Sequence, residues 1–94
     1  MKKPEENQPS SFNEYRKEFF RELCLNITRY RREAGLTQAA FAELTNISKD
    51  HIAHLEAVGD DTYPSIDTLL LMAYHLRIPP YLLTVREKDW DDAL

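Results

Sequence analysis

Residues 37–56 read TQAAFAELTNISKDHIAHLE, and this stretch decides the fold. Thr37 and Ser48 each stand where a hydroxyl oxygen can accept a hydrogen bond from a first-turn amide, so each marks the start of a short helix. Asn46 separates the two helices, and asparagine tolerates the left-handed conformation that a tight turn requires. The stretch therefore predicts two short helices joined at a sharp angle, the second of them over residues 49–57.

The side chains of the second helix fall into an inward and an outward set. Ile52 and Leu55 have the spacing of core residues, together with Ile47 in the turn. The outward positions are all polar: Lys49, Asp50, His51 and His54. A helix that presents only polar side chains suits the major groove of DNA, although a solvated surface helix shows the same pattern.

A long helix is predicted before this stretch. Ser11 and Glu14 have the spacing of a capping box. Apolar residues then recur at spacings of three and four up to Gly35, which suits a left-handed helix end. They are Phe12, Tyr15, Phe19, Leu23, Ile27, Tyr30 and Ala34. Residues 1–9 are polar and contain prolines, which predicts a disordered tail.

After the central stretch, residues 58–64 predict a loop, and Ser65 caps a further helix. The expected buried set of that helix is Ile66, Leu69, Leu70, Met72, Ala73 and Leu76. Pro80 suits the first turn of a short fifth helix. The sequence therefore predicts an all-α, compact five-helix domain over residues 10–85, with an extended first helix and an acidic C-terminal tail over residues 86–94.

Composition sets limits on function. The chain has 94 residues, of which 43% are hydrophobic, and its formal net charge is −4. This length allows one domain with a modest core. The acidity lies mainly in residues 58–94, whereas a nucleic-acid-binding domain often carries a basic excess. The single cysteine, Cys24, adjoins the apolar stripe and cannot form an intrachain disulfide. With no apolar run of about 18 residues and no secretory signal, we expect a cytoplasmic protein without a membrane partner.

The sequence offers little support for enzymatic activity or for metal binding. His51 and His54 share a helix face, but no third ligand stands at a suitable spacing, so neither a metal nor a cofactor is expected. There is no glycine-rich phosphate loop, and no Ser-His-Asp arrangement is indicated. The sequence therefore predicts a binding protein and no catalytic residues.

An ordered set of residues between Leu23 and Leu83 carries a family resemblance. The set comprises Arg31, Gly35-Leu36-Thr37-Gln38, Phe41-Ala42, Ile47-Ser48, Ile52, Glu56, Pro64-Ser65, Leu69, Ala73-Tyr74-His75-Leu76 and Leu83. It resembles the phage-repressor and Cro family of helix-turn-helix domains, the xenobiotic-response-element type. The resemblance implies a bacterial or phage DNA-binding domain of five helices, with the third as recognition helix.

The resemblance also implies roles for individual residues. The start of the second helix, Thr37 and Gln38, matches positions that hold the DNA backbone. The positions that face base edges are matched by Lys49, Asp50, His51 and His54. A buried ion pair that ties the first helix to the end of the third is matched by Arg31 and Glu56.

These inferences predict a repressor-like, sequence-specific transcriptional regulator that binds double-stranded DNA as a homodimer, with the recognition helix over residues 49–57. Its half-sites are expected about 34 Å apart. Two features oppose DNA binding. The loop over residues 59–63 is acidic, and Lys49 is the only Lys or Arg between residues 33 and 76. We therefore expect weak binding by a single copy, because phosphate contacts dominate affinity.

Four aromatic residues suggest an alternative: Phe12, Tyr15, Phe19 and Phe20. They extend the first helix beyond the length that so small a core can cover. They can pack against the chain's own last helix and Trp90, or they can form a dimer interface. A third possibility is a protein-interaction module of the antitoxin or adaptor kind, which would bind a protein partner through this helix and bind little DNA.

Overall fold

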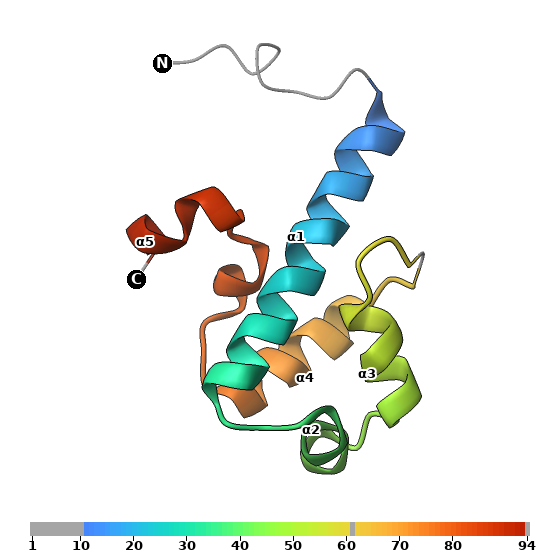
Figure 1. Ribbon diagram of the computed structural model, residues 1–94, viewed down its shortest axis with the longest axis vertical. Helices are drawn as coiled ribbons and strands as arrows, with labels where there is room; N and C mark the ends of the chain where they lie inside the picture. Colours follow the sequence, from blue (N-terminus) through green and yellow to red (C-terminus); the bar gives the residue numbers. More distant parts are fainter. Residues whose placement is uncertain (1–10, 61, 94) are drawn as a thin grey trace.

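The computed structural model describes residues 11–60 and 62–93, so the predicted tail over residues 1–9 lies outside the described part. All regular structure in this part is helical, which confirms the all-α prediction (Figure 1). The main elements are α1 (Phe12–Glu33), α2 (Gln38–Thr45), α3 (Lys49–Glu56) and α4 (Ile66–Leu76). Three short elements follow: the 3-10 helices η2 (Pro80–Thr84) and η3 (Glu87–Asp89), and the single turn α5 (Trp90–Ala93).

The predicted count of five helices is not confirmed, because the segment that begins at Pro80 is a 3-10 helix. Asn26 of α1 offers a physical reason. Its buried amide nitrogen donates to the carbonyl oxygens of Leu83, at 2.9 Å, and of Val85, at 2.7 Å. These carbonyl groups are therefore held by a side chain of α1, and the backbone is extended at Val85.

Side-chain caps explain where the four main helices begin. Each cap hydroxyl accepts a hydrogen bond from the backbone amide three residues later, over 3.0 to 3.1 Å, as predicted. The four caps are Ser11, Thr37, Ser48 and Ser65. A cap of this kind satisfies an amide that has no partner within the helix.

The turn between α2 and α3 depends on Asn46, which adopts the predicted left-handed conformation with φ of 60°. The hydroxyl of Thr45, the residue before it, donates to the Phe41 carbonyl oxygen at 2.7 Å and accepts from the Ile47 amide at 3.3 Å. At the end of α1, Gly35 takes a φ of 74°. Both helix ends are thus set by residues that tolerate positive φ.

The core lies where α1, α2, α3, α4 and η2 meet. Its largest fully buried apolar side chains are Leu23, Ile27, Phe41, Ile52, Leu55, Met72 and Leu83. The prediction for α4 was wrong at two positions, since Ile66 is 71% exposed and Leu70 is 46% exposed. Helical periodicity explains this, because the arc that faces the core runs through Leu69, Met72, Ala73 and Leu76, and the two exposed residues fall to one side of it.

The C-terminal residues lie against α1. The indole nitrogen of Trp90 donates to the Val85 carbonyl oxygen at 3.3 Å, and the Arg29 guanidinium lies 4.2 Å from the centre of the Trp90 ring. The backbone amide of Glu87 donates to a carboxylate oxygen of Glu22 at 2.9 Å. Glu87 and Trp90 therefore contact the domain, and its division at residue 85 stays a prediction.

Candidate nucleic-acid interface

The α2–turn–α3 unit presents the polar face of α3 outward. Ile52 and Leu55 are buried beneath it, whereas Lys49, Asp50 and His54 are exposed and His51 is half-buried. The four predicted base-facing residues thus occupy the side of α3 that points away from the core. Polar donors and acceptors on one exposed helix face can read base edges.

The N-terminus of α2 is the second part of the candidate interface. Thr37 is exposed, and its hydroxyl accepts from the Ala40 amide. Gln38 is half-buried, and its side-chain nitrogen donates to a carboxylate oxygen of Glu56 at 3.1 Å. The amide groups of a helix N-terminus form a site that suits phosphate. Thr37 stands at that end, whereas the Gln38 side chain is held by α3.

Arg31 and Glu56 form a buried, two-pronged ion pair. The Arg31 Nε donates to Oε2 of Glu56 at 2.7 Å, and Nη2 donates to Oε1 at 2.9 Å. The third guanidinium nitrogen, Nη1, donates to the Leu36 carbonyl oxygen at 2.7 Å. One network therefore fixes the end of α1, the start of α2 and the end of α3 relative to one another. The bond from Gln38 to Glu56 was not predicted, because it depends on how α2 packs against α3.

The loop after α3 contacts the outward polar side of α3, which we call the recognition face. Nδ1 of His54 lies 2.8 Å from Oδ2 of Asp60, and the other oxygen of Asp60 accepts from the Thr62 amide at 2.8 Å. The bond and the charge of Asp60 raise the pKa of His54. The bonds from Thr62 and then from His54 lower the pKa of Asp60 to about 2. Sequence reasoning missed this pair, because the loop that brings Asp60 back to α3 follows no helical spacing.

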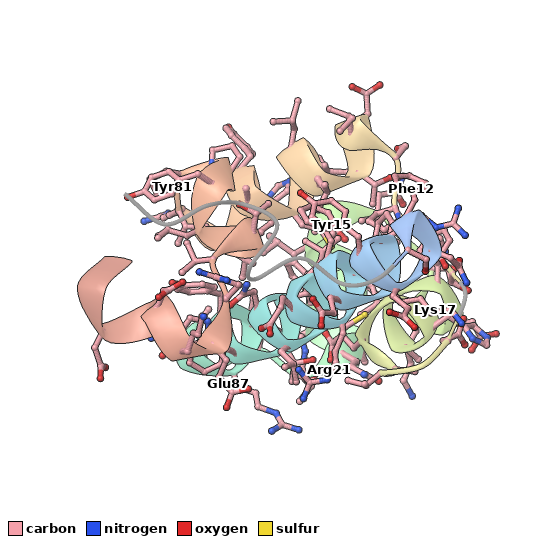
Figure 2. All side chains as sticks on the ribbon, turned by 90° about the horizontal axis from the view of Figure 1, so that it is seen from above. Phe12, Tyr15, Lys17, Arg21, Tyr81 and Glu87 are labelled. Carbon is pink, nitrogen blue, oxygen red and sulfur yellow. The ribbon has the colours of Figure 1, made fainter. Side chains whose placement is uncertain are left out.

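The four aromatic residues of α1 divide into two groups. Phe20 stacks on Tyr63 with ring centres 4.0 Å apart, so it packs within the chain. Phe12, Tyr15 and Phe19 are 75%, 51% and 41% exposed, and we call these three the aromatic stripe. Figure 2 shows Phe12 and Tyr15 on one side of α1, with Lys17 and Arg21 on the other.

Part of the aromatic stripe borders a groove. Tyr15 and Phe19 line one wall, and Thr84, Arg86 and Lys88 line the other. The Trp90 ring, which the sequence offered as a packing partner for these aromatics, lies against Arg29. The aromatic stripe therefore remains largely exposed in the single chain.

The described residues include one cysteine, Cys24. Cys24 is buried, and this burial raises the pKa of its thiol. Residues 11–60 and 62–93 contain no group of three or more His, Cys, Asp or Glu side chains placed to hold a metal ion. Within the same ranges, no helix has the length and apolar character needed to cross a membrane.

Comparison with protein families matches residues 27–83 to the family HTH_3, described as helix-turn-helix. This range covers more than half of the chain and includes α2, α3 and α4 in full. Comparisons with curated proteins and with solved structures gave no match.

Proposed function

Since the chain belongs to the helix-turn-helix family, in its phage-repressor/Cro type, we propose that it is a sequence-specific DNA-binding regulator that acts as a repressor-like homodimer. The observation that carries this proposal is the outward polar face of α3, held at a fixed position beside the N-terminus of α2. The network of Arg31, Glu56 and Gln38 fixes that position.

Each residue of the interface has a role that its chemistry supports. Lys49 donates to guanine O6 and N7, and Asp50 accepts from a cytosine amino group. His51 and His54 add further contacts to base edges. Thr37 and the first amides of α2 bind a backbone phosphate. The side chain of Gln38 is half-buried, and its bond to Glu56 holds the start of α2 in place for the phosphate contact.

The small number of positive charges in α2 and α3 supports DNA binding by two copies of the chain. Lys49 is the only Lys or Arg of α2 and α3, so one copy makes few phosphate contacts. The pairing of Asp60 with His54 offsets one loop carboxylate that would otherwise repel the DNA backbone. Two recognition helices in a dimer would meet half-sites about 34 Å apart, one helical turn of DNA.

The aromatic stripe is the surface we propose for the dimer. Exposed apolar side chains that project past a small core mark an interaction surface. The N-terminal half of α1, which carries the stripe, extends away from α2, α3 and α4 (Figure 1). This placement leaves α3 free to enter the major groove while α1 contacts a second copy.

Selection of bound sequences from random DNA, repeated at two salt concentrations, tests the proposal. We expect an enriched palindromic site whose affinity falls with salt. Lys49→Ala should weaken binding. It should also reduce the slope of log affinity against log salt concentration by about one, because one fewer phosphate is neutralised. Lys88→Ala, which removes the same charge from η3, is the matched control and should leave binding nearly unchanged. Absence of any enriched site would contradict the proposal.

A second candidate is a protein-interaction module on the same fold. The exposed aromatic stripe favours it, as does the net charge of −4. This function predicts that no DNA site is enriched and that a protein partner protects Phe12 and Tyr15 from solvent. The random-DNA selection therefore separates the two candidates.

A further inference from the structure

Two hydrogen bonds on the loop side hold Asp60 in its contact with His54. One carboxylate oxygen of Asp60 accepts from the Thr62 amide, and the backbone amide of Asp60 donates to the Ala57 carbonyl oxygen at 3.0 Å. The loop is further held against α1, where Tyr63 stacks on Phe20. Asp60 is therefore a fixed acceptor beside the recognition face, while the side chain of His54 is 61% exposed.

This geometry determines which nitrogen of His54 carries a proton. An ionised carboxylate can only accept hydrogen bonds, so Nδ1 must be the protonated nitrogen that faces it. Nε2 is then left to approach DNA. In the neutral ring Nε2 is an acceptor, and in the protonated ring it is a donor. The two forms of His54 thus present opposite hydrogen-bonding character at the same place.

We propose that Asp60 positions His54 as a specificity-determining residue whose protonation state selects the base pair that it reads. The protonated ring donates to the O6 or N7 acceptor of guanine, and the neutral ring accepts from the amino group of cytosine. This inference rests on the proposed DNA-binding function. Asp60 acts through His54 and is a positioning residue.

The charged groups around His54 favour its protonated form. Asp60 acts through its bond and its charge, and Asp50, one turn earlier in α3, acts in the same direction. His51 and Lys49 are the other ionisable groups of this face. Two ionisable residues of α1 face the loop. The charge of Asp60 contributes to the raised pKa of the Cys24 thiol, and the Arg16 guanidinium lies over the Tyr63 ring. The change in base preference should therefore occur above the ordinary histidine pKa of 6.5.

The test compares base preference at two pH values. The full chain is used to select sites from random DNA at about pH 6 and about pH 9, on either side of histidine titration. The base pair that His54 contacts is identified as the position of the selected site at which His54→Ala lowers the preference for one base over the others. At this position we expect the preference for guanine over cytosine to fall by about threefold to tenfold at the higher pH, the range of one net hydrogen bond.

Two variants make the test specific. Asp60→Asn keeps an oxygen for the Thr62 amide but removes the charge, so the change in preference should move to lower pH. His75→Ala replaces a histidine of α4, outside the DNA-binding face, and is the control that should leave the change in place. If wild type enriches a site whose preferences are the same at both pH values, or if His54→Ala alters no base preference, this inference is wrong and the proposed function stands. If no site is enriched at either pH, the proposed function itself fails.

Discussion

Arg31 joins three segments through one side chain, since its guanidinium contacts Glu56 at the end of α3 and the Leu36 carbonyl before α2. Both partners of the ion pair are largely buried, with side-chain exposures of 8% and 4%. A buried pair of this kind contributes little net stability over apolar residues, but loss of one partner leaves an uncompensated charge. Its role is to fix the position of α3.

Replacement of one partner should therefore be costly. Glu56→Gln leaves the Arg31 charge buried without its carboxylate, and we expect the free energy of unfolding to fall by about 3 kcal/mol. Urea denaturation measures the change. Glu33→Gln removes an exposed carboxylate that pairs with the half-buried Arg29, and it is the matched control, with an expected change of about 0.5 kcal/mol or less. Equal changes in the two variants would contradict a structural role for the buried pair.

The His54–Asp60 pair gives stability a pH dependence whose sign follows from the two shifts. The pKa of His54 is raised, so its contribution is complete below the ordinary value of 6.5 and is lost as pH rises through the folded pKa. The pKa of Asp60 is lowered to about 2, so its contribution is complete above the ordinary value of 3.8 and is lost as pH falls toward 2. The pair therefore stabilises most between pH 3.8 and 6.5.

Thermal unfolding across pH checks this window. The Tm of His54→Ala should lie below that of wild type between these two pH values, by a small amount because the pair is exposed. The difference should shrink at alkaline pH, where the charge of His54 is lost and only the hydrogen bond of the neutral ring to Asp60 remains. A Tm difference for His54→Ala that does not change with pH would rule out the ionic contribution.

Among the elements, α2 and α4 both end in a left-handed residue. Asn46 ends α2 with φ of 60°, and Arg77 ends α4 with φ of 58°. Asparagine adopts this conformation at low cost, whereas a side chain like that of arginine meets steric strain there. The conformation at Arg77 lets the Ile78 amide donate to the Ala73 carbonyl oxygen at 3.1 Å, which closes the end of α4.

Glycine at this position should relieve the strain. We expect Arg77→Gly to raise the free energy of unfolding by about 0.5–1 kcal/mol, net of the greater freedom that glycine adds to the unfolded chain. Arg77→Ala removes the same side chain but retains a Cβ at positive φ, so it should give no such gain. Urea denaturation of both variants separates backbone strain from loss of charge. A gain of the same size in both would assign the effect to the charge.

At the scale of the whole molecule, α1 has a covered half and a projecting half. Leu23, Ile27 and Tyr30 are buried in the core, while the aromatic stripe at the other end of the helix is exposed. The 22 residues of α1 span about 33 Å at 1.5 Å per residue. The projecting half is thus available to a partner without any change to the core.

The oligomeric state tests this surface. We expect wild type to be dimeric by size exclusion with light scattering, and the double variant Phe12→Ser with Phe19→Ser to be monomeric. Its fold should persist, because neither side chain is buried. Ile66→Ser with Tyr74→Ser alters the exposed face of α4, at positions 71% and 76% exposed, and should leave the dimer intact. Loss of the dimer only in the α4 variant would place the interface on α4.

Much of the fold could be predicted because its signals are local. The four caps and the left-handed Asn46 act within a few residues, so they can be recognised without knowledge of the rest of the chain. The count of five helices is not confirmed, because the segment that begins at Pro80 is a 3-10 helix. Asn26, far away in the sequence, binds the carbonyl groups of Leu83 and Val85 there. Burial of Ile66 and Leu70 was predicted wrongly, since apolar character alone does not say how wide an arc of α4 is covered.

The residues of the helix-turn-helix stretch by themselves determined where α2 and α3 begin, how they are joined and which side of α3 faces outward. Only the tertiary structure decided which polar residues of that region are already engaged. Gln38 is held by Glu56, and His54 is held by Asp60. The physical reason is that caps, turns and periodicity depend on neighbouring residues, whereas these pairs depend on the path of a loop and on the angle between packed helices.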